Sequence, residues 1–156
     1  MDLSLRPVVD ADLPLFFAFN RQPAGVRMAA FTPPDPDDRE AFDAHWARIR
    51  ARETVLLRTV EVDGVVVGSV LSWESDDGPE ISYWVDESHW GRGIATEALR
   101  QFLLVQTRRP LRARVVTDNL GSIRVLRKNG FVEQAVERGF AHGRGREVEE
   151  YVMVLA

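Results

Sequence analysis

The 156-residue chain contains no cysteine. This absence excludes disulfide bonds, thiolate metal sites and a cysteine nucleophile. No apolar run approaches the ~18 residues that a membrane helix needs, and the opening residues, MDLSLRPVVDADL, lack the basic-then-apolar pattern of a signal peptide. From these absences we expect a cytoplasmic protein with no membrane partner.

Metal ligands and excess positive charge are also scarce. The three histidines show neither H-x-E nor H-x-x-x-H spacing, so we expect no metal site. The formal net charge of −4 gives no electrostatic reason to bind nucleic acid. The remaining composition, 45% apolar and 28% charged, is ordinary for a globular protein. The length is typical of one domain, which we expect to span residues 1–156.

Hydrophobic periodicity predicts a mixed α/β chain with the order β-α-α-β-β-β-α-β-α-β-β. We expect Asp10 to cap a helix over 11–20, and the unpatterned stretch 21–36 to be a long loop. Asp63-Gly64 between two alternating segments predicts a β-hairpin. The other predicted elements are strands over 3–8, 55–62, 65–73, 80–85, 111–117, 131–138 and 147–155, and helices over 37–52, from 94 onward, and over 119–129, the last closed by Gly130.

The stretch HWGRGIATEAL, residues 89–99, enters a helix through a turn with almost no side chains. Gly91 and Gly93 lack the Cβ atoms that would keep a ligand away from the backbone, and glycine readily adopts positive φ. A helix N-terminus leaves its first N–H groups unpaired and carries about half a positive charge. The turn is therefore either a pyrophosphate site, to which Arg92 adds a bidentate contact, or only a tight strand-to-helix connection.

The residues around this turn resemble a known family. The stretch YWVDESHWGRGIATEAL, residues 83–99, is similar to the acetyl-CoA-binding motif of the GCN5-related N-acetyltransferases (the GNAT family), and most similar to the branch that acetylates ribosomal-protein N-termini. A second block over 117–131, T-D-N-x-x-S-x-x-V-L-x-K-x-G-F, resembles the corresponding block of that branch. The opening LSLRPVVDADL and the closing EYVMVL match its first and last elements, so the resemblance covers nearly the whole chain.

The resemblance implies a single-domain GNAT-like α/β fold, in which helices flank a mixed, mostly antiparallel sheet whose central strands splay apart. Acetyl-CoA would be the cosubstrate, with its pantetheine arm along the backbone of Trp84 and Val85. Its pyrophosphate would rest on the backbone N–H groups of Gly91, Arg92, Gly93, Ile94, Ala95 and Thr96. Dimers are common in such folds, and the sequence leaves open whether this chain forms a homodimer.

Acetyl transfer to an amine needs a base, donors for an oxyanion, and a proton or hydrogen bond for the leaving thiolate. We predict Glu80 as the base, because burial in a strand raises the pKa of a carboxyl group and its distance from Gly93 resembles the family's strand glutamate. The alternative is that Glu80 only opens the strand and faces water. Strand alternation puts Glu80, Ser82 and Trp84 on one face and Ile81, Tyr83 and Val85 on the other.

The family often has a tyrosine as the acid where this chain has Leu126. We therefore predict that Ser122, one turn earlier, hydrogen-bonds the thiolate, the alternative being that Ser122 only belongs to its helix turn. Asn119 likewise has two roles open to it, a bond to pantetheine and the N-cap of the following helix. The acceptor is predicted to lie over the 21–36 loop and the 139–145 turn, whose side chains include Arg27, Phe31, His142 and Arg144.

These residues together predict an acetyl-CoA-dependent N-acetyltransferase that transfers the acetyl group directly, since a cysteine acyl intermediate is excluded. The acceptor is a primary amine, either a peptide or protein N-terminus, which only the branch resemblance favours, or a small-molecule amine. Leu126 keeps open a non-catalytic CoA-binding sensor or scaffold. A fold-only relative that binds a partner through its sheet is the third alternative.

Overall fold

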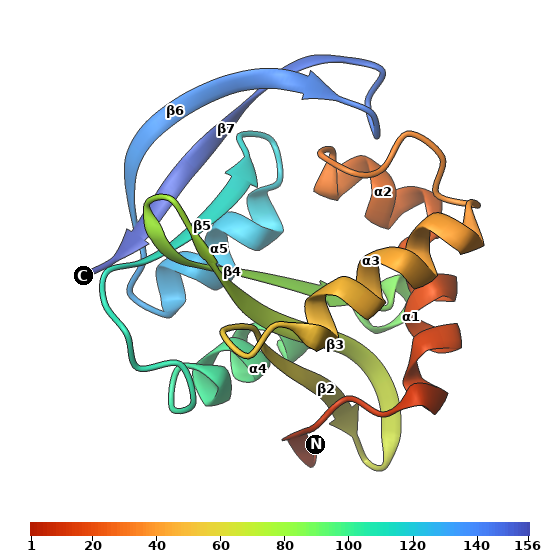
Figure 1. Cartoon of the computed structure of the whole chain (residues 1–156). Helices are drawn as coiled ribbons and strands as arrows, with labels where there is room; N and C mark the ends of the chain where they lie inside the picture. The colour runs from red at the N-terminus through yellow and green to blue at the C-terminus, as the bar shows by residue number, and fades with distance from the viewer.

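A computed structural model describes residues 1–156, and one seven-stranded sheet runs through them in the order β1-β2-β3-β4-β5-β7-β6 (Figure 1). The strands are β1 (Leu3–Arg6), β2 (Leu56–Val62), β3 (Val65–Ser75), β4 (Gly78–Val85), β5 (Leu111–Val116), β6 (Val132–Ala141) and β7 (Arg146–Leu155). The helices are α1 (Leu13–Asn20), α2 (Pro23–Ala29), α3 (Arg39–Ala51), α4 (Ile94–Phe102) and α5 (Leu120–Lys128). All neighbouring strands are antiparallel except β4 and β5, which confirms the predicted mixed sheet.

The two central strands separate soon after they meet. β4 and β5 pair only where Glu80 lies opposite Arg112 and Ile81 lies opposite Ala113. β4 then continues to Val85 without a partner on that side, and Figure 1 shows the two strands diverging. The predicted splay is therefore confirmed, and it leaves an opening in the middle of the sheet.

Helices cover both faces of the sheet around this opening. On one face, α4 and α5 pack on the main core, whose buried residues include Ile81, Leu99, Phe102, Ile123 and Leu126. On the other face, α1 and α3 form a smaller core from Phe16, Phe19, Trp46 and Ile49, against which Trp84 packs. The alternation predicted for β4 is confirmed, because Tyr83 packs with the first core and Trp84 with the second. None of the helices has the length and hydrophobicity that would let it cross a bilayer.

Two predictions for the N-terminal third are wrong. Residues 23–29, inside the predicted loop, form α2, which begins with Pro23 at its first turn, where the fixed φ of proline suits a helix. Asp10 does not cap the following helix. Residues 10–12 form a 3₁₀ turn, α1 begins at Leu13, and Asp10 accepts instead from Arg50. The carboxylate that fixes this turn is that of Asp12, which accepts from the Val9 N–H at 3.0 Å.

The predicted turns agree with the structure more closely. Asp63 and Gly64 have φ angles of 51° and 81°, as a two-residue hairpin between β2 and β3 requires. Gly130, with φ of 92°, follows α5, and the Phe131 N–H donates across the helix end to the Leu126 carbonyl at 3.0 Å. The β6–β7 connection is shorter than predicted, because β6 extends to Ala141 and β7 begins at Arg146.

Candidate functional site

A cavity of about 1180 Å³ extends through the opening between β4 and β5. Its walls come from both layers of helices, with Phe42 and Trp46 of α3 on one side and Thr96 and Val125 of α4 and α5 on the other. The opening therefore connects the two faces of the sheet. The predicted site residues that line the cavity are Glu80, Trp84, Val85, Gly91, Gly93, Ile94, Ala95, Thr96, Asn119 and Ser122. Arg92 is the one predicted site residue that does not line it.

The glycine turn presents bare backbone at the start of α4. Gly91 and Gly93 have φ angles of 78° and 76°, and a Cβ added to either would meet no atom within 4 Å. The N–H groups from Gly91 to Thr96 donate to no acceptor in the protein. Arg92 is exposed and makes no ion pair. Unpaired N–H groups at a helix N-terminus, with room in front of them, have the geometry and charge that bind phosphate.

The predicted pantetheine contacts, Trp84 and Val85, are already engaged within the protein. The Trp84 indole donates to the Phe19 carbonyl at 3.2 Å, which fixes the end of β4 against α1. The Val85 carbonyl accepts from the indole of Trp90 at 2.9 Å. This bond ties the glycine turn to the end of β4, and a carbonyl oxygen retains a second lone pair for a ligand.

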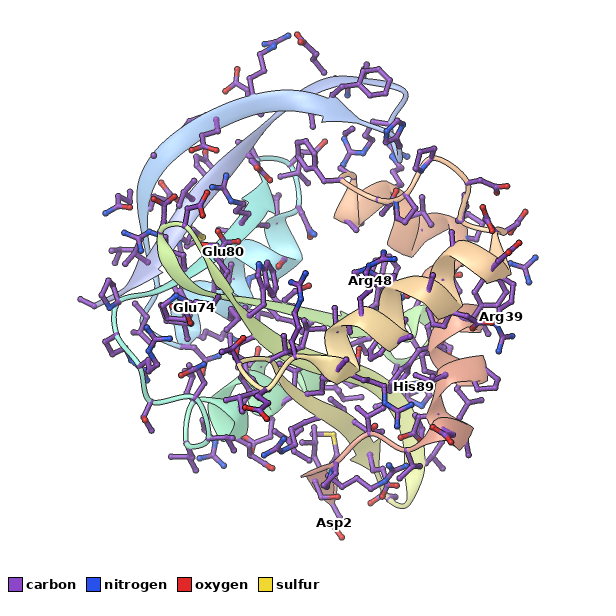
Figure 2. The ribbon with its side chains drawn as sticks, viewed as in Figure 1. Asp2, Arg39, Arg48, Glu74, Glu80 and His89 are labelled. Atoms are coloured by element: carbon purple, nitrogen blue, oxygen red, sulfur yellow. The ribbon has the colours of Figure 1, made fainter.

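Glu80 lies inside the molecule and does not face water. It is 7% exposed, and its carboxylate lies 3.6 Å from the Arg114 Nε. Figure 2 shows it on β4, beneath the arch of the β6–β7 hairpin. The Arg114 guanidinium also pairs with Glu137 and, at 3.2 Å, with Glu150. Two carboxylates of the cavity wall, Glu80 and Glu150, therefore share one arginine.

Sequence reasoning missed Arg114 and Glu150 because they come from β5 and β7, far from the recognised motifs. Burial raises the pKa of Glu150, and the hydrogen bond and charge of Arg114 oppose this rise. The contact between Arg114 and Glu150 depends on the β5–β7 register, which pairs Val116 with Glu150. No local pattern in the sequence specifies that register.

Ser122 lies at the first turn of α5, and its hydroxyl contacts the hydroxyl of Tyr83 on β4. The Tyr83 hydroxyl oxygen is 2.5 Å from Ser122 Oγ. Burial raises the pKa of Tyr83 to about 12, and the bond with Ser122 opposes this rise. Leu126 is buried in the core. A tyrosine hydroxyl thus reaches the site from β4 and not from α5.

Asn119 is the N-cap of α5, because its side-chain oxygen accepts from the Ser122 N–H at 3.2 Å. This confirms one of its two predicted roles. Its side-chain nitrogen donates to the Met28 carbonyl at 3.2 Å, so Asn119 also holds α2 against α5. A contact between Asn119 and pantetheine stays a prediction.

The predicted acceptor region is tied together by Arg144. This side chain, only 5% exposed, pairs with both Asp118 oxygens at 2.7 and 2.8 Å and donates to the Arg27 carbonyl at 2.6 Å. The tip of the β6–β7 hairpin is thereby fixed to α2, which it faces in Figure 1. Phe31 lines the cavity, whereas Arg27, His142 and Arg144 do not. No group of three or more His, Asp or Glu side chains is arranged to hold a metal ion.

Known proteins resemble this chain both in sequence and in structure. A family model described as an acetyltransferase (GNAT) domain matches residues 2–132. The probable N-acetyltransferase YjcK of Bacillus subtilis (strain 168) is 32% identical over 99 residues, which are 60% of this chain and 51% of YjcK. The chain spans little more than half the length of the curated relatives it matches.

Solved structures agree over almost the whole chain. Mycobacterium smegmatis RimJ in complex with CoA-disulfide has a TM-score of 0.84 at 24% identity, covering 98% of this chain and 81% of that one. The ribosomal-protein-alanine N-acetyltransferase from Brucella melitensis has a TM-score of 0.81 at 24% identity, covering 97% of this chain and 98% of that one. These likenesses show that this chain has the same fold.

Proposed function

Because the chain belongs to the GNAT acetyltransferase family, we propose that it transfers the acetyl group of acetyl-CoA directly to a primary amine. One observation supports this most strongly, the cavity that crosses the splayed sheet. The unpaired N–H groups of the glycine turn lie at one part of this cavity. A buried carboxylate, Glu80, and a hydroxyl, Ser122, reach it from opposite faces of β4.

In this proposal the pyrophosphate of acetyl-CoA rests on the N–H groups from Gly91 to Thr96. The open space in front of Gly91 and Gly93 admits it, and the exposed Arg92 adds a contact from outside. The pantetheine arm follows the end of β4 past Trp84 and Val85 into the opening. The thioester then lies between the two faces of the sheet.

The acceptor amine enters from the side of Glu80, where two carboxylates of the cavity wall share one guanidinium. A cationic ammonium group is favoured there, and Glu80 takes its proton, directly or through one water. The free amine attacks the thioester carbonyl, and the nitrogen of the resulting tetrahedral intermediate loses its second proton by the same route. Past Ile81, the edge of β4 that faces β5 has no strand partner, so its backbone donors are available to the oxyanion. As the intermediate collapses, the thiolate leaves toward Ser122.

The acceptor class is part of the proposal. A peptide or protein N-terminus is favoured by the motifs that resemble the ribosomal-protein branch, and a small-molecule amine is the other candidate. A panel that contains both classes, assayed by release of the CoA thiol, separates them. The assay has no background from the protein, since the chain has no cysteine.

Replacing Glu80 with glutamine tests the base. We expect kcat to fall on the order of 10²-fold, with acetyl-CoA binding retained. Glu137→Gln is the matched control, because Glu137 is half exposed and pairs with the same Arg114. An equal loss in both variants would reassign Glu80 to holding Arg114 in place. Acetyl-CoA binding without thiol release for any amine would instead identify a CoA-binding sensor or scaffold.

A further inference from the structure

The hydroxyl of Ser122 has one partner in the protein, the hydroxyl of Tyr83 at 2.5 Å. The Tyr83 hydroxyl also lies 3.4 Å from the Ser122 carbonyl, which is much farther than the Ser122 hydroxyl and so competes weakly for its single hydrogen. Both side chains line the cavity. Their backbones are held independently, Tyr83 by β4 and Ser122 by the Asn119 cap of α5.

The direction of this hydrogen bond decides what Ser122 offers to a ligand. A phenol is a stronger donor and a weaker acceptor than an aliphatic alcohol, so Tyr83 donates and the Ser122 oxygen accepts. The Ser122 hydrogen then has no acceptor in the protein and is left for a group in the cavity. We propose that Tyr83 is a positioning residue, which orients the Ser122 hydroxyl so that it donates to the sulfur of CoA. This inference rests on the proposed function, and it deepens the account of the leaving group.

The pair acts by hydrogen bonding and not by giving up a proton. The thiol of CoA is a stronger acid than Tyr83, whose pKa burial raises to about 12, because a free thiol has a pKa near 8.5. The sulfur therefore leaves as a thiolate that accepts from Ser122 while Ser122 accepts from Tyr83. No bond to hydrogen breaks in this pair. The amine gives up two protons in all: Glu80 passes the first to water when the ammonium group is deprotonated, and the second, lost from the nitrogen as the tetrahedral intermediate collapses, neutralises the thiolate.

The test measures the pKa of the CoA thiol in the binary complex, which needs no acceptor amine. Thiolate absorbance in the ultraviolet reports that thiol alone, because the protein has no cysteine, and a titration without CoA subtracts the tyrosine signal. In the wild-type complex we expect the thiol pKa to lie about one to two units below that of the Ser122→Ala complex. Tyr83→Phe should recover about half a unit to one unit of that difference. Tyr151→Phe, at the only other tyrosine, should recover none.

The double variant separates positioning from direct contact. If Tyr83 acts through Ser122, adding Tyr83→Phe to Ser122→Ala changes the thiol pKa no further. A further rise in the double variant would mean that Tyr83 touches the sulfur itself, and would overturn the inference. Equal thiol pKa values in the wild type and Ser122→Ala would overturn it as well. Failure to bind CoA at all would reject the proposed function, so the two failures are distinguishable.

Discussion

Replacing Gly93 with alanine separates the two interpretations of the glycine turn. Gly93 adopts φ 76° and ψ 12° directly before α4, and an added Cβ meets no atom within 4 Å. In the free protein the alanine therefore costs only the strain of a left-handed conformation, about 1–2 kcal/mol. The expected fall in Tm is roughly 2–8 °C for a chain of this size.

Gly64 provides a matched control outside the cavity. It has φ of 81° in the β2–β3 hairpin, and an added Cβ there also meets no atom within 4 Å. Gly64→Ala should therefore cost the free protein about as much as Gly93→Ala. It does not line the cavity, so it should leave the response to acetyl-CoA unchanged.

The two variants are expected to differ in how much acetyl-CoA stabilises them. At about 100 times its Kd, a ligand stabilises the folded state by about 2.7 kcal/mol, which is roughly 5–10 °C in Tm. A methyl group at Gly93 that holds the pyrophosphate off the N–H groups loses one or two charge-assisted hydrogen bonds of about 1.5–3 kcal/mol each. A loss of about 2.7 kcal/mol raises Kd roughly 100-fold. At the same ligand concentration the variant then gains only about 0.4 kcal/mol.

Thermal unfolding of the wild type and both variants, with and without acetyl-CoA, measures these values directly. A ligand shift that disappears in Gly93→Ala and persists in Gly64→Ala is the expected result. An equal shift in both variants would refute the reasoning, because the pyrophosphate would then lie elsewhere. No shift even in the wild type would leave HWGRGIATEAL as a tight entry to a helix and nothing more.

Three further predictions concern pH, packing and the acceptor side. Burial alone would raise the pKa of Asp12, but its hydrogen bonds lower it to about 2. Its contribution, about 2–3 kcal/mol, is therefore present above pH ~4 and lost as the pH falls toward 2, and Asp12→Asn should flatten this part of a plot of Tm against pH. Gly143→Ala puts a Cβ 2.5 Å from the Val26 carbonyl, and equilibrium unfolding should show a loss of about 1–3 kcal/mol. Burial raises the pKa of Glu150, so the wild type loses stability as the pH rises through that pKa. The Tm of Glu150→Gln relative to the wild type should therefore increase over the same pH range. A difference in Tm that stays constant with pH would contradict the raised pKa.

The parts of the fold that the sequence predicted well depend on local preferences. Asp63-Gly64 gives a two-residue turn because both residues tolerate positive φ. Gly130 ends α5 for the same reason. The alternation of β4 needs only the two-residue period of a strand. In each case the information lies within a few residues of the feature.

The errors occur where distant contacts decide. A helix of seven residues such as α2 is unstable alone, and here it packs against β4 so closely that a Cβ on Gly25 would lie 2.8 Å from the Trp84 ring. Asp12 stabilises the turn before α1 because Arg6 and Thr59 also bond its carboxylate. Trp84 and Thr59 are far along the chain from these segments, and only Arg6 among these partners is local.

In the predicted site too, the sequence could not show what depends on distant contacts. Alternation correctly assigned Tyr83 to the face of β4 opposite Glu80, and that face is the main core, so a tyrosine there is expected to be only a packing residue. Successive residues of a closed sheet cannot serve one reaction from opposite faces, because the sheet separates them. In this chain β4 keeps only two pairs with β5, so the sheet is open beside Tyr83. On its other side β4 stays paired with β3 as far as Val85, and Gly68 of β3 allows this close approach, because a Cβ there would collide with the Trp84 carbonyl oxygen. The short pairing between β4 and β5 is therefore what allows a buried tyrosine of β4 to take part in chemistry.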